Sequence, residues 1–188
     1  MKTVLITGAT RNTGLAIAKR FAKEGFQIAL TSRERSSAEN TAKEIEKEFA
    51  VKCRGYEMTF DGTDSIGCVF QKIYEDFGSL DVFVANSANL GLNIGLLNAT
   101  EEDFDAICNV NLKGTFFACQ KAAELMKSGG GSIVTIGSVQ GTGAVFGRTV
   151  YAITKAGISM LVKSMAYELG RYGIRANNVV AGAIHSAR

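Results

Sequence analysis

Three residues in the second half of the chain have the types and spacing to transfer a proton. Ser138 ends a strand-like run, Tyr151 follows after 12 intervening residues, and Lys155 follows the tyrosine by four positions. A tyrosine and a lysine four positions apart share one face of a helix, with Cβ atoms about 5–6 Å apart. An ammonium beside a phenol favours the phenolate, so the pair can exchange a proton with a carbonyl or alcohol oxygen near neutral pH. The serine hydroxyl can hold that same oxygen.

Taken alone, the tyrosine and lysine are weak evidence for catalysis. Their spacing is common by chance, and a tyrosine on a helix is usually a half-buried core residue. Two further features favour the catalytic interpretation: Ser138 follows a predicted strand, and the amino-terminal segment has a nucleotide-binding pattern. Together they predict a proton transfer that accompanies the transfer of a hydride.

The amino-terminal segment predicts a dinucleotide site. An apolar run at 3–7 leads into a turn with glycines at positions 8 and 14, and a helical pattern follows. Glycine permits positive φ and a close approach of the backbone to a pyrophosphate, and the amino end of the helix supplies N–H donors for the anion. The predicted cofactor contacts of this turn are Gly8, Thr10, Arg11, Asn12, Thr13 and Gly14.

Short apolar runs alternate with amphipathic helical patterns along the chain. This alternation predicts an α/β fold: a single doubly wound parallel sheet of the Rossmann type, with helices on both faces, in one domain over residues 1–188. Two helices begin with the spacing of a capping box, Ser36-x-x-Glu39 and Thr100-x-x-Asp103. The predicted strands are 3–7, 27–32, 52–58, 81–85, 132–136 and 175–180, and the predicted helices are 14–24, 36–49, 64–77, 100–127 and 150–171.

Composition narrows the class of protein. A net charge of +3, with basic residues scattered rather than clustered, argues against nucleic acid as a partner. Four cysteines without a C-x-x-C pair, and a single histidine, predict that there is no metal site and that the cysteines are buried free thiols in a reducing compartment. The histidine, His185, is expected at the surface, and a position that faces the substrate is the alternative. Without a signal peptide or a membrane-length apolar run, we expect a soluble cytoplasmic protein with no membrane contact.

These patterns together resemble the short-chain dehydrogenase/reductase family. The family's Thr-Gly-x-x-x-Gly-x-Gly pattern is met at Gly8 and Gly14, whereas Asn12 stands at the middle glycine. Asparagine tolerates the left-handed backbone conformation better than most residues, so we expect the turn to survive. The resemblance runs through the whole chain, and it implies a nicotinamide cofactor and a small-molecule carbonyl or alcohol substrate.

Further segments resemble family motifs in the family's order. Residues 61–64 resemble the adenine-side motif, residues 85–88 stand at an Asn-Asn-Ala-Gly motif, and residues 180–184 replace a Pro-Gly segment. Asn111 matches the asparagine of the family's catalytic tetrad, although a polar residue that kinks a long helix would fit the same pattern. The resemblance implies catalytic roles for Asn111, Ser138, Tyr151 and Lys155, and cofactor contacts at Asp61, Gly62, Asn86, Ser87, Ala88, Tyr151, Lys155, Gly182, Ile184 and Ser186.

The end of the second predicted strand bears on the choice of cofactor. A fold of this type that prefers NAD would place an acid there, and an acid would repel a 2′-phosphate. Ser32 and Arg33 stand there instead, and Arg11 in the glycine turn is placed to reach the same phosphate. One charged hydrogen bond of about 1.5–3 kcal/mol gives roughly tenfold to hundredfold preference, so we predict NADP(H). The alternative is that both arginines are solvated surface charges.

The implied mechanism gives each residue of the tetrad a role. Tyr151 exchanges the proton as general acid/base and Ser138 holds the substrate oxygen. Lys155 favours the phenolate and binds the nicotinamide ribose, while Asn111 anchors a water that passes the proton to solvent. A protein that binds NADP(H) without turnover, as a sensor or scaffold, is the alternative.

The family resemblance also bears on assembly and on the end of the chain. Relatives usually pair through the helices near 102–127 and 150–171, so we expect a homodimer or homotetramer. An apolar stripe on the second helix serves either this contact or packing on the sheet. Family members continue beyond a sixth strand, so we expect the C-terminal lid and last strand to be missing here, and substrate identity is not predicted. The stripe consists of Ile158, Leu161, Val162, Met165 and Leu169.

Overall fold

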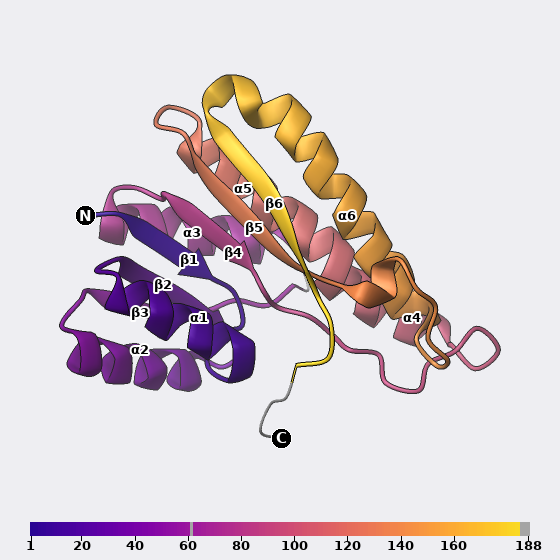
Figure 1. Ribbon diagram of the computed structural model, residues 1–188. Coiled ribbons are helices and arrows are strands. Elements are labelled where there is room, and N and C mark those ends of the chain that lie inside the picture. The colour runs from indigo at the N-terminus through magenta and orange to yellow at the C-terminus, as the bar shows by residue number, and fades with distance from the viewer. Residues whose placement is uncertain (61, 185–188) are drawn as a thin grey trace.

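One parallel sheet organises the chain in the computed structural model, which describes residues 1–60 and 62–184 (Figure 1). The strand order is β3-β2-β1-β4-β5-β6. The order reverses between β1 and β4, and ligands of doubly wound sheets bind at the carboxyl ends of the strands beside such a reversal. The strands are β1 (Thr3–Ile6), β2 (Gln27–Ser32), β3 (Cys53–Glu57), β4 (Val82–Ala85), β5 (Gly131–Ser138) and β6 (Ile174–Ala181).

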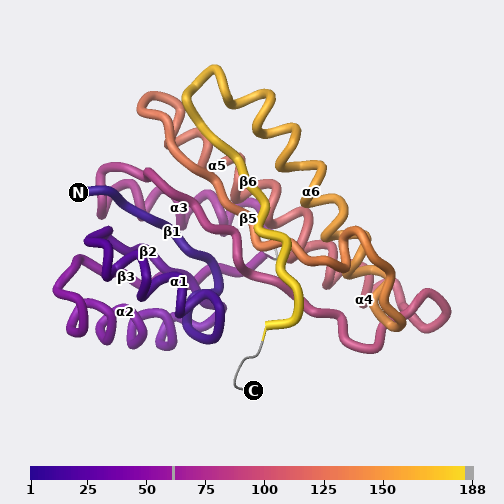
Figure 2. Tube along the Cα trace, in the orientation of Figure 1, coloured from indigo at the N-terminus to yellow at the C-terminus, as the bar shows by residue number. Residues whose placement is uncertain are grey.

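Helices cover both faces of the sheet (Figures 1 and 2). All residues of β1 are buried, because Val4 and Ile6 belong to a core with α1 and α2, while Leu5 belongs to a second core with α3, α5 and α6. A strand buried on both faces is what its continuous apolar sequence predicts. The helices are α1 (Asn12–Lys23), α2 (Arg35–Phe49), α3 (Thr63–Phe77), α4 (Glu101–Cys108), α5 (Thr115–Met126) and α6 (Thr149–Leu169).

The predicted α/β sheet is confirmed, with one interruption in a predicted helix. The helix predicted over 100–127 is divided by a π-helix, η1 (Asn109–Gly114), between α4 and α5. Short 3-10 turns, η2 (Val139–Gly141) and η3 (Gly170–Tyr172), follow β5 and α6. The capping box of Thr100 and Asp103 is present. The box predicted at Ser36 is wrong, because α2 begins after Glu34 with no side-chain cap.

The apolar stripe of α6 packs mainly on the sheet. Ile158, Val162 and Met165 are 2%, 6% and 8% exposed, so they are part of the protein's interior. Leu161 and Leu169 are only partly buried beside them. Of the two alternatives for the stripe, packing on the sheet therefore holds for Ile158, Val162 and Met165.

The cysteines only partly follow the prediction of buried thiols. Cys53 and Cys119 are buried, and burial raises the pKa of each thiol to about 12. Cys68 is exposed and Cys108 is half-buried, because both face outward from their helices. Within residues 1–60 and 62–184, no helix has the length and apolar character needed to cross a membrane.

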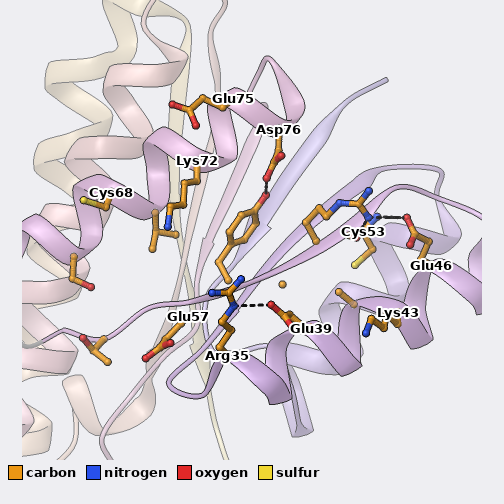
Figure 3. A pocket seen from close by; sticks show the side chains of 17 residues that line it. Arg35, Glu39, Lys43, Glu46, Cys53, Glu57, Cys68, Lys72, Glu75 and Asp76 are labelled. Atoms are coloured by element: carbon orange, nitrogen blue, oxygen red, sulfur yellow. Dashed lines mark hydrogen bonds and ion pairs between the residues drawn. The ribbon is translucent and has the colours of Figure 1, made fainter.

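A cavity of about 780 Å³ lies along the outer edge of β3, between α2 and α3 (Figure 3). Arg54 Nη1 donates to Glu46 Oε1 at 3.1 Å and to the carbonyl of Cys53 at 2.9 Å, and Cys53 N–H donates to Glu46 at 3.4 Å. These bonds occupy backbone groups at the edge of the sheet, where an unpaired strand would otherwise attract another chain. The predicted catalytic residues do not line this cavity.

Candidate active site

The packing of α6 against the end of β5 brings Ser138 and Lys155 into one region. Lys155 Nζ donates to the carbonyl of Ile136 at 2.7 Å. A Cβ at Gly141 would lie 2.9 Å from the carbonyl carbon of Lys155, so glycine is required for η2 to approach α6 this closely. Ser138 is half-buried at the last position of β5, and its Oγ accepts from the N–H of Gln140 at 3.1 Å. Its hydroxyl hydrogen therefore remains available for a substrate oxygen.

Tyr151 and Lys155 lie one turn apart on α6, and both are buried. Their exposed fractions are 9% and 5%, and Lys155 Nζ lies 5.6 Å from the centroid of the tyrosine ring. Burial lowers the pKa of Lys155 to about 8, because a low-dielectric environment disfavours the ammonium. The lysine is therefore a cation at neutral pH that can release its proton close to the physiological range.

The side chain of Asn111 is buried in η1 and is fully occupied by protein partners. Its Oδ1 accepts from the N–H of Asn89 at 2.7 Å, and its Nδ2 donates to the carbonyl of Asn89 at 2.9 Å and to Thr154 Oγ1 at 3.2 Å. Thr154 in turn donates to the carbonyl of Tyr151 at 2.7 Å. Asn111 thus joins the loop after β4 to the helix turn that carries Tyr151, and its predicted role in anchoring a water stays a prediction.

The glycine turn between β1 and α1 has the shape that a pyrophosphate site requires. Gly8 and Asn12 have φ of +63° and +48°, so Asn12 takes the left-handed conformation expected of it. A Cβ at Gly14 would lie 2.4 Å from the carbonyl oxygen of Gly8 and 2.6 Å from Asn86 Nδ2. A side chain at Gly14 would therefore fill the cradle, whereas glycine leaves the backbone open beside the first turn of α1. Thr10 and Thr13 are half-buried in the same turn.

Asn86 and Ser87 hold this turn in place from the end of β4. Asn86 Nδ2 donates to the carbonyls of Thr7 and Gly8 at 2.9 and 3.1 Å. The backbone N–H groups of Asn86 and Ser87 both donate to Thr7 Oγ1 at 3.0 Å. The amide of Asn86 is thus engaged with protein backbone and holds the glycine turn in its shape, and its predicted contact with the cofactor stays a prediction.

The residues predicted to select the cofactor gather at one corner of the sheet. The N–H of Ala9 donates to the carbonyl of Thr31 at 3.0 Å, which joins the glycine turn to the end of β2. Arg11 follows Ala9 by two positions, Ser32 and Arg33 follow Thr31, and both arginines are exposed. In the part of the chain that the structure describes, neither arginine forms an ion pair. The corner therefore presents two positive charges beside the cradle.

The remaining predicted cofactor contacts lie on more exposed segments. Gly62 precedes α3, Ala88 lies in the loop after β4, and Gly182 and Ile184 follow β6. All four are exposed, and Ile184 is 55% exposed. Asp61, His185 and Ser186 lie outside the described residues.

Four residues of the site were not predicted from the sequence. Thr7 and Asn89 bond to Asn86 and Asn111, as described above, and Thr154 lies between Asn111 and Tyr151. Arg148 lies with its guanidinium carbon 5.5 Å from the centroid of the Tyr151 ring. Spacing along the chain gives no signal for the bonds of Thr7 to Asn86, of Asn89 to Asn111 and of Thr154 to Asn111, since these partners are distant in sequence. Thr154 and Arg148 are each three positions from Tyr151, and this spacing could have indicated both.

Comparison with known proteins agrees with a Rossmann-type site for a nicotinamide cofactor. Residues 2–188 match the sequence family described as short chain dehydrogenase. The chain is 34% identical to the 3-oxoacyl-[acyl-carrier-protein] reductase FabG of Aquifex aeolicus, over 98% of this chain and 75% of that protein. The chain belongs to the short-chain dehydrogenase family and is an oxidoreductase of that family.

Solved structures of the family superpose closely on the chain. An alcohol dehydrogenase from the archaeon Thermococcus sibiricus, complexed with 5-hydroxy-NADP, has a TM-score of 0.92 at 29% identity, over 98% of this chain and 77% of that one. An NAD⁺-bound xylitol dehydrogenase has a TM-score of 0.94 at 27% identity, over 99% of this chain and 72% of that one. Structures similar to this chain thus hold nicotinamide dinucleotides of both kinds.

Proposed function

We propose that this protein catalyses reversible hydride transfer between NADP(H) and a carbonyl or secondary alcohol, with Tyr151 as the general acid/base. The observation that carries the proposal is the buried pair of Tyr151 and Lys155 on α6, packed against the strand end that carries Ser138. A protein that only bound the dinucleotide could use the lysine, but it would have no need of Ser138, Tyr151 and Lys155 together.

The proposed mechanism assigns one task to each side chain. Ser138 donates a hydrogen bond to the substrate oxygen. Tyr151 gives its proton to that oxygen as negative charge develops there, and takes the proton back in the reverse direction. Lys155 stabilises the phenolate that results and is held in place by the carbonyl of Ile136. The nicotinamide supplies or accepts the hydride when it is bound, as is usual for this cofactor.

Substitution of Tyr151 tests the mechanism. We expect Tyr151→Phe to lower turnover by about 10²–10⁴-fold, the usual contribution of a general acid, while the variant still binds NADPH. The assay is the loss of NADPH absorbance with a panel of carbonyl compounds. The panel includes 3-oxoacyl thioesters, since a 3-oxoacyl-carrier-protein reductase is among the relatives. Binding of NADPH without turnover of any substrate would instead favour the sensor or scaffold alternative.

The preference for NADP(H) rests on the corner formed by Arg11, Ser32 and Arg33. A 2′-phosphate at this corner would meet two guanidinium groups and a hydroxyl, and charge-assisted bonds of this kind are the strong ones. Similar structures hold either NAD⁺ or an NADP derivative, so the fold alone does not indicate which cofactor is bound. The proposal therefore rests on the side chains at this corner.

We also propose that the protein is cytoplasmic and that it forms a homodimer or homotetramer. The contact between copies would be made by α5 and α6. Ile153, Met160 and Tyr167 follow one another at intervals of seven on α6, and they are 52%, 60% and 92% exposed. Phe116 on α5 is 45% exposed beside a hollow of about 330 Å³ between the two helices. A seven-residue apolar spacing on an exposed helix face is typical of helix pairing.

A further inference from the structure

Arg148 connects the start of α6 to the loop that follows β4. Its Nη1 donates to the carbonyl of Leu90, and its backbone forms an isolated parallel bridge with Ile94. Its guanidinium carbon lies 5.5 Å from the centroid of the Tyr151 ring, within the range of a cation–π contact. Arg148 is half-buried, so part of this contact is removed from solvent. The residue therefore contacts both the predicted general acid/base and a loop at the edge of the site.

Arginine is a poor choice for this position if only the helix is considered. Arg148 is the N-cap of α6, and its side chain makes no capping hydrogen bond. N-cap residues are usually serine, threonine, aspartate or asparagine, whose oxygen accepts from a backbone N–H of the first turn. A guanidinium has no acceptor, and its charge stands at the positive end of the helix dipole. Residues that break local rules in this way are expected mainly at functional positions.

Little other charge lies close to Tyr151 in the surrounding segments. Residues 82–100 and 128–147, which include β4, β5 and the loops after them, contain no Asp, Glu, Lys, Arg or His. The β6 strand carries Arg175, which is exposed at the opposite, amino-terminal end of the strand. The charged side chains of α4 and η1, which also pack on α6, are Glu101, Glu102, Asp103, Asp105 and Lys113, and none of them is buried.

We propose that Arg148 is a positioning residue for Tyr151 that also adds a second positive charge in favour of the phenolate. This inference rests on the proposed role of Tyr151 as general acid/base. Arg148 and Lys155 are the i−3 and i+4 neighbours of the tyrosine, so both lie on its face of the helix. Their charges lie 5.5 and 5.6 Å from the ring centroid. A cation over a ring attracts the ring's electrons, and this attraction grows when the ring carries a negative charge.

Two substitutions separate the charge of Arg148 from its hydrogen bond. Arg148→Gln keeps N–H donors for the carbonyl of Leu90 but removes the charge, whereas Arg148→Lys keeps the charge. The measurement is the pH profile of kcat for alcohol oxidation, because this direction of the reaction requires the phenolate. We expect the midpoint of the profile to lie about 0.5–1 pH unit higher in R148Q than in the unsubstituted protein. In R148K we expect the midpoint to stay close to that of the unsubstituted protein. Arg175→Gln removes an equal charge far from Tyr151 and should leave the midpoint in place.

The inference is overturned if R148Q has the midpoint of the unsubstituted protein, or if R148K moves as far as R148Q. The first result, with a raised KM for anionic substrates alone, would assign Arg148 to substrate binding. The second result would mean that Arg148 acts through the shape of its guanidinium and the bond to the carbonyl of Leu90, and that its charge has no effect on Tyr151.

A second measurement needs neither turnover nor cofactor. The ultraviolet absorbance of phenolate is titrated in each protein and in its Tyr151→Phe counterpart, and the difference isolates Tyr151 from the other tyrosines of the chain. We expect the Tyr151 signal of R148Q to titrate at higher pH than that of R148K. If this occurs while the carbonyl panel shows no turnover, the proposed function fails, whereas the effect of the Arg148 charge on the Tyr151 phenolate is still observed. If Tyr151→Phe abolishes turnover while R148Q is unchanged in both measurements, the inference alone fails.

Discussion

Lys155 Nζ donates to the backbone carbonyl of Ile136 at 2.7 Å, and this bond joins α6 to β5. The lysine is 5% exposed. Among the described residues, its ammonium has one hydrogen-bond acceptor, the carbonyl of Ile136. A single neutral acceptor compensates poorly for the loss of water around a charge. The buried ammonium therefore lowers the stability of the folded protein, and it also keeps a cation beside Tyr151.

The cost of burying Lys155 predicts how stability depends on pH. The pKa of Lys155 is lowered from 10.5 to about 8 by burial, so below pH 8 both states are charged and the folded state carries the full cost. Between pH 8 and 10.5 the unfolded chain holds a proton that the folded chain has released, so the free energy of unfolding rises with pH. Lys155→Met has no such proton. Relative to this variant, the free energy of unfolding of the unsubstituted protein should rise by up to about 3 kcal/mol between pH 8 and 10.5.

Urea unfolding without cofactor, at pH of about 7 and about 10, measures this gain. The comparison with Lys155→Met cancels titration of the other groups, which both proteins share. A difference between the two proteins that stays constant with pH would contradict the assignment of a depressed pKa to this lysine.

Gly14 is expected to be essential for the dinucleotide cradle. In Gly14→Ala the new Cβ would lie 2.4 Å from the carbonyl of Gly8 and 2.6 Å from Asn86 Nδ2, so the turn must move. We expect NADPH affinity to fall by at least about tenfold, since displaced N–H groups lose charge-assisted bonds to phosphate. Calorimetric titration with NADPH measures the loss. Unchanged affinity in the alanine variant would contradict the cradle.

Gly67 provides a matched control for that substitution. It lies inside α3, where an added Cβ meets no atom within 4 Å. Because alanine is the better helix former, Gly67→Ala should raise the free energy of unfolding by about 0.5–1 kcal/mol and leave NADPH affinity unchanged.

The arginine corner predicts the direction of cofactor preference. Arg33→Asp replaces a cation with the type of side chain that would repel a 2′-phosphate. We expect the ratio of NADPH to NADH affinity to fall by roughly tenfold to a hundredfold, with NADH affinity changed little. Arg11→Gln should act in the same direction and more weakly, because it adds no negative charge. Equal affinities for the two cofactors before any substitution would refute the preference for NADP(H).

The sequence could predict those features that depend on neighbours along the chain. The strands, the capping box of Thr100 and the left-handed Asn12 all follow from local pattern or from the backbone preference of one residue. The division of the helix at η1 did not follow, because it accompanies bonds of Asn111 to Asn89 and Thr154, which are 22 and 43 positions away. Contacts at such distances are fixed by the packing of the whole sheet, which spacing does not encode.

The bond between Asn111 and Thr154 predicts a stability effect from a nearly isosteric substitution. In Thr154→Val the buried methyl packing is kept, but Asn111 Nδ2 loses an acceptor and the carbonyl of Tyr151 loses a donor. The carbonyl of Tyr151 keeps its bond within α6, so Asn111 Nδ2 is the group that loses a partner. An unsatisfied buried polar group costs about 1–3 kcal/mol, and the free energy of unfolding should fall by about that amount. Thr142→Val, at an exposed hydroxyl bonded to Val139, should change stability little. Equal effects of the two substitutions would contradict a structural role for Asn111.

The exposed face of α6 predicts the behaviour of an assembly variant. Met160 is 60% exposed, whereas Ile158, two positions earlier, is 2% exposed and packs on the sheet. A charge at Met160 would therefore disturb a helix contact between copies without entering the core, and Met160→Glu should reduce the mass found by light scattering to that of one chain. Its unfolding should become independent of protein concentration, because an oligomer that dissociates on unfolding is stabilised by mass action. An oligomer of unchanged mass in this variant would place the contact elsewhere, and a monomer before substitution would contradict assembly itself.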